Sequence, residues 1–322
     1  MNTQNSENHY DSIPVLILGF RRIPGVIELT SICATVGVKK IYLALDGPKI
    51  EEDQDLQKTL IKEFIQITRH NGIEVEILER DHNLGVAAAI ISALDWFFEK
   101  ERIGIILEDD VRPNLDFFSF ASEALEKFEG NKDIWMISGN QFFPGSNSHN
   151  RVSCTNYPLI WGWATWRNQW LLMRAGLLDA NLYAQKSRFS PVRQFLDVGK
   201  RRSLSGYVDS WALPLAQAQF SMNGVTIIPP TNLSTNIGAD SFAVHTEQQS
   251  WHMAHKNIEL PNSYVLDLDN RSEVLKLNNR LIEKYVFKIK LRHRYLFIYS
   301  PLIDFISYIS GKKSEILMNR LP

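Results

Sequence analysis

The first half of the chain alternates short apolar runs with amphipathic segments. Apolar runs of β type, bounded by turn residues, predict strands, and segments with helical spacing between them predict helices. The predicted strands are 14–20, 39–47, 73–79, 102–107 and 133–139, and the predicted helices are 25–37, 51–72, 85–100 and 116–128. This β-α-β-α order predicts an α/β fold, with a mostly parallel central sheet and helices on both of its faces.

Charged residues follow three of the predicted strands. Arg21 and Arg22 follow the first strand, Asp46 follows the second, and the triplet Glu108, Asp109 and Asp110 follows the fourth. In sheets of this kind, ligands bind beyond the carboxyl ends of the strands. We therefore expect these groups to converge on one edge of the sheet.

The second half of the chain is less regular. It predicts a long loop over 140–158, a tryptophan-dense stretch over 161–173, a helix over 209–224, a strand over 225–230 and a polar loop over 231–246. From about Asn257 the composition changes, and "KYVFKIKLRHRYLFIYSPLIDFISYIS" mixes cations with large apolar residues.

Composition limits the class of protein. A chain of 322 residues that is 44% hydrophobic can bury a sizeable core, as one large domain with additions. With 35 basic against 36 acidic residues, no nucleic-acid partner is expected. Two cysteines, Cys33 and Cys154, give no disulfide framework and favour a reducing compartment. The polar first residues predict no signal segment, and no apolar run predicts a transmembrane helix.

The acidic triplet has two interpretations. Mg²⁺ and Mn²⁺ bind carboxylate oxygens and often share their coordination shell with phosphates, so a triplet after a buried strand indicates a metal–diphosphate site. A solvated acidic turn is the alternative. Nearby, Arg80, Asn83 and Gly85 lie between a strand and a helix, where a helix N-terminus attracts anions. A simple strand-to-helix turn explains those residues equally well, and an exposed loop does so for Arg21 and Arg22.

Six stretches in this order resemble the nucleotide-sugar-dependent glycosyltransferases of GT-A type. The likeness is to bacterial relatives of the N-acetylglucosaminyltransferase that initiates complex N-glycans. The stretches are "PVLILGFRR", "LALDGP", "HNLGVAAAIISALDWFF", "GIILEDDVRPNLDFFSF", "YPLIWGWATWRNQW" and "DSWALPLAQAQFSMNGVTIIPPTNLSTNIGADSFAVHT". The resemblance implies a GT-A (Rossmann-like) catalytic domain over 1–256, with its nucleotide-binding part at 14–140 and its acceptor side at 141–256. The remainder, 257–322, is expected to be a C-terminal helical extension.

The resemblance also implies roles for single residues. In the DXD-like triplet, Asp110 matches the ligand of Mn²⁺ or Mg²⁺, Asp109 a ribose contact and Glu108 a donor-sugar contact. Asp46 matches an acid that binds the base, usually uracil, and Arg21 an arginine near the diphosphate. The residues matched to these roles, together with the loop residues named above, form the expected donor site: Arg21, Asp46, Arg80, Asn83, Glu108 and Asp109.

Two further residues match positions close to the reaction. Asp209 matches the general base of inverting relatives, which takes the proton of the acceptor hydroxyl. Two alternatives stay open: Asp209 is an acid that only interacts with the helix terminus, or Glu108 or Asp240 is the base. His245 resembles a late histidine that touches the metal or the diphosphate, with His252 and His255 as competitors and a surface histidine as the plain alternative.

The expected activity is a metal-dependent inverting transfer from a UDP-sugar to a glycan or lipid-linked glycan, in bacterial surface polysaccharide synthesis. Trp161, Gly162 and Trp163 are expected in the sugar pocket, since aromatic faces stack on sugars, with core packing as the alternative. The basic, apolar C-terminal segment predicts either membrane-surface contact or a helix packed on the domain. We expect a cytoplasmic protein, with the inner face of the membrane as its second location. The competing functions are a sugar nucleotidyltransferase and a non-catalytic scaffold.

Overall fold

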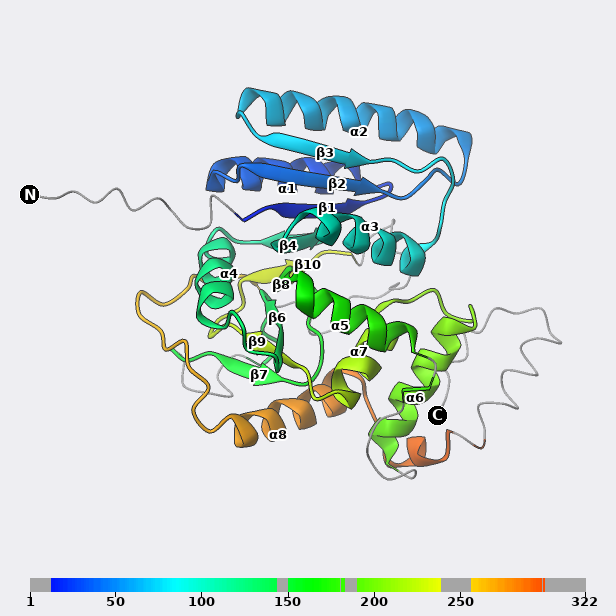
Figure 1. Ribbon diagram of the computed structural model, residues 1–322, viewed down its shortest axis with the longest axis vertical. Coiled ribbons are helices and arrows are strands. Elements are labelled where there is room, and N and C mark those ends of the chain that lie inside the picture. Colours follow the sequence, from blue (N-terminus) through cyan, green and yellow to red (C-terminus); the bar gives the residue numbers. More distant parts are fainter. Residues whose placement is uncertain are drawn as a thin grey trace, which may run out of the picture.

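The computed structural model is organised around one large central sheet (Figure 1). It describes residues 13–143, 150–179, 181–182, 190–238, 256–296 and 298. The first four strands along the chain are β1 (Val15–Gly19), β2 (Lys40–Leu45), β3 (Glu74–Leu78) and β4 (Ile103–Glu108). They lie side by side in the order β3-β2-β1-β4 and run parallel to one another.

The sheet continues beyond β4 with four strands from later in the chain. These are β8 (Trp163–Trp166), β6 (Ile134–Ser138), β9 (Val225–Ile228) and β7 (Ser153–Thr155), in that spatial order. β8 runs antiparallel to both β4 and β6, and β7 runs antiparallel to β9, while β6 and β9 are parallel. The predicted α/β fold with a mostly parallel sheet is confirmed.

Two short strands correct the sequence prediction. The stretch 231–246, predicted as a polar loop, contains β10 (Ser234–Asn236), which pairs antiparallel with β5 (Val111–Pro113). The predicted loop over 140–158 contains β7. Each of these strands has only three residues, so no periodicity is long enough to reveal it. Pairing with a distant partner stabilises such strands instead.

Helices cover both faces of the sheet, as the alternation along β1 requires. Val15 and Ile17 point to the face covered by α1 (Ile23–Val36), α2 (Glu51–His70) and α4 (Asp116–Lys127). Leu16 and Leu18 point to the other face, which α3 (Val86–Lys100), α5 (Arg167–Leu178) and α7 (Ala212–Ser221) cover. Successive side chains of a strand point to opposite faces, so each residue of β1 contributes to one of two separate cores.

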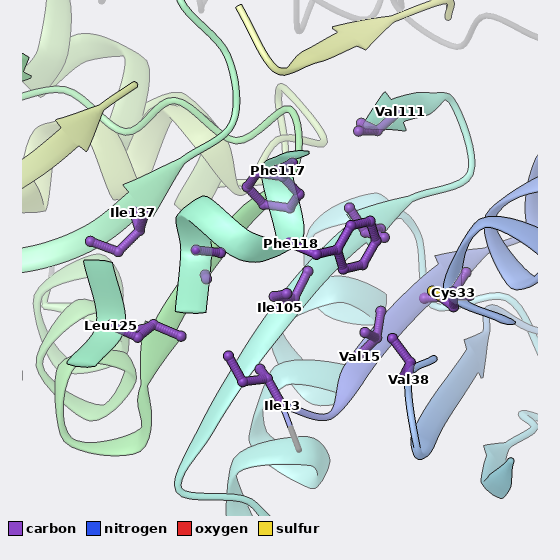
Figure 2. Packing of buried hydrophobic residues seen from close by; sticks show 14 of the residues in the cluster. Ile13, Val15, Cys33, Val38, Ile105, Val111, Phe117, Phe118, Leu125 and Ile137 are labelled. Atoms are coloured by element: carbon purple, nitrogen blue, oxygen red, sulfur yellow. The ribbon is translucent and has the colours of Figure 1, made fainter. Parts of the chain in front are cut away.

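Figure 2 shows the core beneath α4. Val15 of β1 lies next to Ile105 of β4, its partner in the parallel register, and Phe118 of α4 packs above them. In the same cluster, Val111 directly follows the acidic triplet along the chain, and Phe117 lies in the first turn of α4. The ends of β1 and β4 are therefore anchored in one packed unit, which gives the charged residues beyond them a fixed platform.

The C-terminal part of the chain packs at the end of the sheet formed by β7. It contains α8 (Arg271–Leu281), the π-helical turn η3 (Ile282–Val286) and the 3₁₀ helix η4 (Leu291–Tyr295), while α6 (Pro191–Leu204) precedes α7. Asn278 of α8 donates a 2.9 Å hydrogen bond to the Cys154 carbonyl of β7. The expected C-terminal helical segment is confirmed. None of the described helices is both long and apolar enough to cross a bilayer.

Candidate functional site

Glu108 is the last residue of β4, and Asp109 and Asp110 connect it to β5. The triplet is held against the end of β1. The backbone N–H of Asp109 donates to the Leu18 carbonyl at 3.0 Å. Its carboxylate accepts a 3.2 Å hydrogen bond from the backbone N–H of Phe20. A Cβ at Gly25, in the first turn of α1, would lie 1.9 Å from the Asp109 carbonyl oxygen, so only glycine permits this approach. The start of α1, the end of β1 and the triplet are one packed unit.

The arginine beside the triplet is Arg22, whereas the resemblance matched its neighbour Arg21 to the diphosphate. One guanidinium nitrogen of Arg22 lies 3.2 Å from Asp109 Oδ1 and 3.6 Å from Asp110 Oδ2, and the Arg22 side chain is only 10% exposed. Two adjacent arginines gave no signal for which one faces the acids, because that depends on how the chain turns into α1. Arg22 thus supplies a basic partner for two of the three carboxylates.

Arg22 offsets only part of the negative charge of the triplet, so the three carboxylates still repel one another. Burial, then the charges of Asp110 and Asp109, raise the pKa of Glu108 well above its usual range. Burial and the charge of Asp110 raise the pKa of Asp109 to about 6, although Arg22 opposes the shift. Burial also raises the pKa of Asp110, against the opposing effect of Arg22. A further cation at this turn would be stabilised by all three carboxylates.

The oxygens of Asp110 are the part of the turn best suited to a metal ion. Asp110 Oδ1 is buried and accepts no hydrogen bond, which is costly for a carboxylate unless a ligand uses the oxygen. Across the part of the chain that the structure describes, no three carboxylate, imidazole or thiolate groups are arranged as a metal centre. The residues fit a hard cation such as Mg²⁺ or Mn²⁺ that takes one or two carboxylates and completes its shell with phosphate oxygens and water.

The β10 strand closes the other side of this turn. The backbone N–H of Ile237 donates to the Asp110 carbonyl at 2.8 Å. A Cβ at Gly238 would lie 2.3 Å from Asp110 Oδ2, so the glycine lets the backbone approach the carboxylate. Asn236 hydrogen-bonds Asp110, which works against the rise in the pKa of that group. These residues were missed, because β10 itself was not predicted from the sequence.

Asp46 and Asp209 share the backbone donors at the start of α3. Asp46 accepts from the N–H of Leu84 at 2.8 Å, and Asn83 Nδ2 donates to it at 2.7 Å. The N–H of Gly85 also donates to Asp46, at 3.2 Å, and Asp209 accepts from the N–H groups of Val86 at 2.7 Å and Ala87 at 2.9 Å. Gly85, at the N-cap position of α3, provides no side-chain cap. The anion-binding end of α3, anticipated from the sequence, is filled by two carboxylates of the protein itself.

Arg80 and Arg21 are also engaged within the protein. Arg80 donates to the Leu45 carbonyl at 2.9 Å and to the Ala89 carbonyl at 3.0 Å, which links β2 to α3. Arg21 pairs with Asp53 of α2 through two hydrogen bonds, of 2.6 and 2.9 Å. Both arginines lie at the predicted sheet edge, but each holds neighbouring elements together there.

The pair between Arg21 and Asp53 gives a prediction for acid stability. Arg21 and the N–H groups of Lys49 and Ile50 lower the pKa of Asp53, against the effect of burial. An acid with a lowered folded-state pKa stabilises the fold above its unfolded value, about 3.9, and the contribution is lost as the pH falls. We expect Asp53→Asn to lower the free energy of unfolding by about 1 to 2 kcal/mol at pH 7, with the difference shrinking below about pH 4.

Urea denaturation of the wild type and of Asp53→Asn, from pH 7 to below about pH 4, checks the prediction. Asp55→Asn is the matched control, because Asp55 is an exposed acid of the same helix, and it should change the free energy of unfolding by under about 0.5 kcal/mol. A difference for Asp53→Asn that stays constant with pH would contradict the ion pair as its cause.

The tryptophans divide into core and partly exposed residues. Trp163 is fully buried in β8 and stacks on Trp211, with ring centroids 6.1 Å apart. A buried side chain offers no surface to a substrate, so we assign Trp163 to the core. Trp161 is partly exposed and packs edge-on against Phe142. A Cβ at Gly162 would lie 2.9 Å from Ser234 Oγ, so the close approach there is to β10.

The histidine predicted at the metal lies outside the described residues. His245 and its competitors His252 and His255 all fall between 239 and 255, as does Asp240.

Among the described residues, the structure brings together Glu108, Asp109 and Asp110 with Arg22. At the neighbouring strand ends it places Asp46, Asn83 and Asp209 around the start of α3.

Comparison with known proteins gives little further guidance. No protein-family model and no curated protein sequence matches the chain. Among solved structures, HddC from Yersinia pseudotuberculosis complexed with GMP-PN is similar over 48% of this chain and 77% of its own, at 13% identity and a TM-score of 0.30. The UTP-bound UGPase from Acinetobacter baumannii is similar over 70% of this chain and 88% of its own, at 9% identity and a TM-score of 0.33. At such low scores neither similarity decides the function, which has to be inferred from the site residues.

Proposed function

We propose that the protein is a metal-dependent glycosyltransferase that transfers a sugar, with inversion, from a nucleotide-diphosphate sugar to a glycan acceptor. The observation that carries the proposal is the acidic turn after β4. It combines three carboxylates, of which Asp110 has a buried oxygen without a hydrogen-bond partner. Its position beyond the carboxyl end of a central parallel strand is the position where ligands bind in such sheets.

The proposed roles follow from what each group can do. Asp110 holds Mn²⁺ or Mg²⁺, with His245 as a second ligand. Asp109 and Glu108 face the ribose and the donor sugar. A metal bound there would neutralise the charge that develops on the nucleoside diphosphate as it leaves. Arg22 lies next to the same carboxylates, so we add it to the diphosphate site beside Arg21. Planar guanidinium groups pair well with phosphate oxygens.

The residues around α3 would recognise the nucleotide and activate the acceptor. Asp46 binds the base, with uracil favoured, and Arg80 and Asn83 hold the loop that positions it. Asp209 takes the proton of the acceptor hydroxyl as that oxygen attacks the anomeric carbon. Trp161 and Gly162 border the sugar pocket. One base is sufficient for a single displacement with inversion, and no covalent intermediate on the protein is needed.

A sugar nucleotidyltransferase is the second candidate, because it would use the same carboxylates and a nucleotide, and UGPase is one of the structures compared. The connection after β1 argues against it. β1 ends at Gly19 and α1 begins at Ile23, which leaves little room for a glycine-rich phosphate-binding loop. A scaffold without catalytic activity is the third candidate. The triplet argues against it, because burying three mutually repelling carboxylates is unfavourable and a scaffold needs no such cluster.

Product analysis separates the three candidates. With Mn²⁺, a panel of nucleotide sugars and a mixture of glycan acceptors, a glycosyltransferase releases a nucleoside diphosphate. With UTP or GTP and sugar 1-phosphates, a nucleotidyltransferase releases pyrophosphate. A scaffold releases neither, although it can still show a metal-dependent thermal shift with a nucleotide. Release of pyrophosphate, without any nucleoside diphosphate, would replace our proposal by the second candidate.

A further inference from the structure

The segment that follows α8 is docked on the body of the protein by one set of apolar side chains. Ile282 and Leu296 are buried, and Val286, Phe287 and Ile289 pack against the core cluster formed with α6 and α7. The Phe287 ring stacks on that of Phe195 in α6, with centroids 5.5 Å apart. Figure 1 shows η4 lying beside α6. The segment therefore has a defined position and a defined outer surface.

A second set of apolar side chains in the same segment points outward. Leu291 is 70% exposed, the highest value among the large apolar side chains that the structure describes. Tyr285, Tyr295 and Ile298 are also exposed. Single exposed apolar residues are ordinary on protein surfaces, whereas several together indicate an interaction site. Tyr285 also contacts Phe143 of the domain, but docking on the domain does not explain the exposure of Leu291 and Ile298, because the inward set already anchors the segment.

Cations surround these outward side chains. Lys284, Lys288, Lys290 and Arg292 are exposed, and the last two flank Leu291 along the chain. Within the described part of the protein, none of the four forms an ion pair with a carboxylate. Burial, then the charges of Arg292 and Lys290, lower the pKa of the neighbouring His293. The acid of this segment, Glu283, accepts a 2.7 Å hydrogen bond from the Tyr157 hydroxyl.

We propose that this basic–apolar face binds the surface of an anionic lipid bilayer. It consists of Lys284, Tyr285, Lys288, Lys290, Leu291, Arg292, Tyr295 and Ile298. The cations pair with lipid phosphates, and the apolar side chains enter the boundary between headgroups and acyl chains. A nucleic acid would use the cations and tyrosines but would leave Leu291 and Ile298 in water. The proposal does not rest on the glycosyltransferase function.

Flotation of the full-length protein with lipid vesicles tests the proposal. We expect binding to phosphatidylcholine vesicles that contain phosphatidylglycerol, weaker binding at high salt, and little binding to phosphatidylcholine alone. Changing Lys284, Lys288, Lys290 and Arg292 to Gln should lower the partition coefficient about a thousandfold. Leu291→Ser should lower it about threefold or more, because it removes inserted apolar surface.

Matched variants make the test specific to this face. The charge control changes Lys39, Lys62, Lys127 and Lys132, which are exposed elsewhere, to Gln. The apolar control is Leu171→Ser, on α5, where Leu171 is 55% exposed. Both controls should bind vesicles like the wild type, and melting temperatures show whether every variant is folded. Equal loss in variants and controls, no vesicle binding by the wild type, or binding to an RNA homopolymer instead would each overturn the proposal.

Discussion

Asp110→Asn is expected to abolish the metal-dependent response of the protein to nucleotides without destabilising the ligand-free protein. The carboxylate is the proposed metal ligand, and its Oδ1 is buried without a hydrogen-bond partner. An amide removes the charge that a metal needs. It also relieves the crowding that raises the pKa values of Glu108, Asp109 and Asp110. Loss of ligand binding with an unchanged or raised melting temperature is typical of a functional site that costs stability.

Thermal shift and turnover measure the two halves of this prediction. At a hundredfold excess over its dissociation constant, a ligand stabilises the native state by about 2.7 kcal/mol. For the wild type we expect a shift of this size with one nucleoside diphosphate and Mn²⁺, and almost none for Asp110→Asn. Turnover should fall by about a thousandfold or more.

Asp55→Asn is the matched control for Asp110→Asn, since Asp55 is an exposed acid on α2, and it should behave like the wild type. If Asp110→Asn kept the full metal-dependent shift, the triplet would be a solvated turn with an arginine partner, and the metal site would have to lie elsewhere.

Asp209→Asn is expected to lower turnover by about a hundredfold to ten-thousandfold, the range for loss of a general base, while leaving the fold nearly intact. Asp209 accepts hydrogen bonds from Val86 and Ala87 at the start of α3. Each carboxylate oxygen of Asp209 accepts one of these bonds, and Asn has one oxygen acceptor, so this substitution keeps one of the two bonds and removes the base and its charge. The free energy of unfolding should fall by about 1 kcal/mol, for the loss of one hydrogen bond.

Asp209→Ala separates the two roles further. It removes both cap and base, so we expect a loss of about 1 to 2 kcal/mol in the free energy of unfolding and turnover as low as that of Asp209→Asn. Full turnover in both variants, with a stability loss that is larger in Asp209→Ala than in Asp209→Asn, would mean that Asp209 only caps the helix. Another group would then have to act as the base, and Glu108 and Asp240 are the first to test.

The arrangement around Asp209 also suggests how base and nucleotide sites are coupled. Asp46, proposed to bind the nucleotide base, accepts from Leu84 and Gly85. Asp209 accepts from the next two residues of the same backbone, Val86 and Ala87. A shift of this loop on nucleotide binding would therefore move Asp209 as well. The backbone at the start of α3 therefore binds both the carboxylate proposed to recognise the nucleotide, Asp46, and the carboxylate proposed to act as the base, Asp209.

The sequence by itself determined the first half of the fold. Five strands and four helices follow directly from the apolar periodicity, since that pattern is local and long enough to specify each element. The order of these elements also placed the triplet and Asp46 at the carboxyl ends of parallel strands, because right-handed crossovers leave few other arrangements. The location of the candidate site was thus predictable from the chain alone.

Only the tertiary structure decided which groups meet at that site. Arg22 faces Asp109 while Arg21 faces Asp53, and no local pattern distinguishes two adjacent arginines. Asp209 meets Val86 although more than a hundred positions separate them. The strand β10 exists because β5 pairs with it. Contacts of this kind depend on how distant segments pack, and the free energy that selects them comes from burial and pairing that the local sequence does not contain.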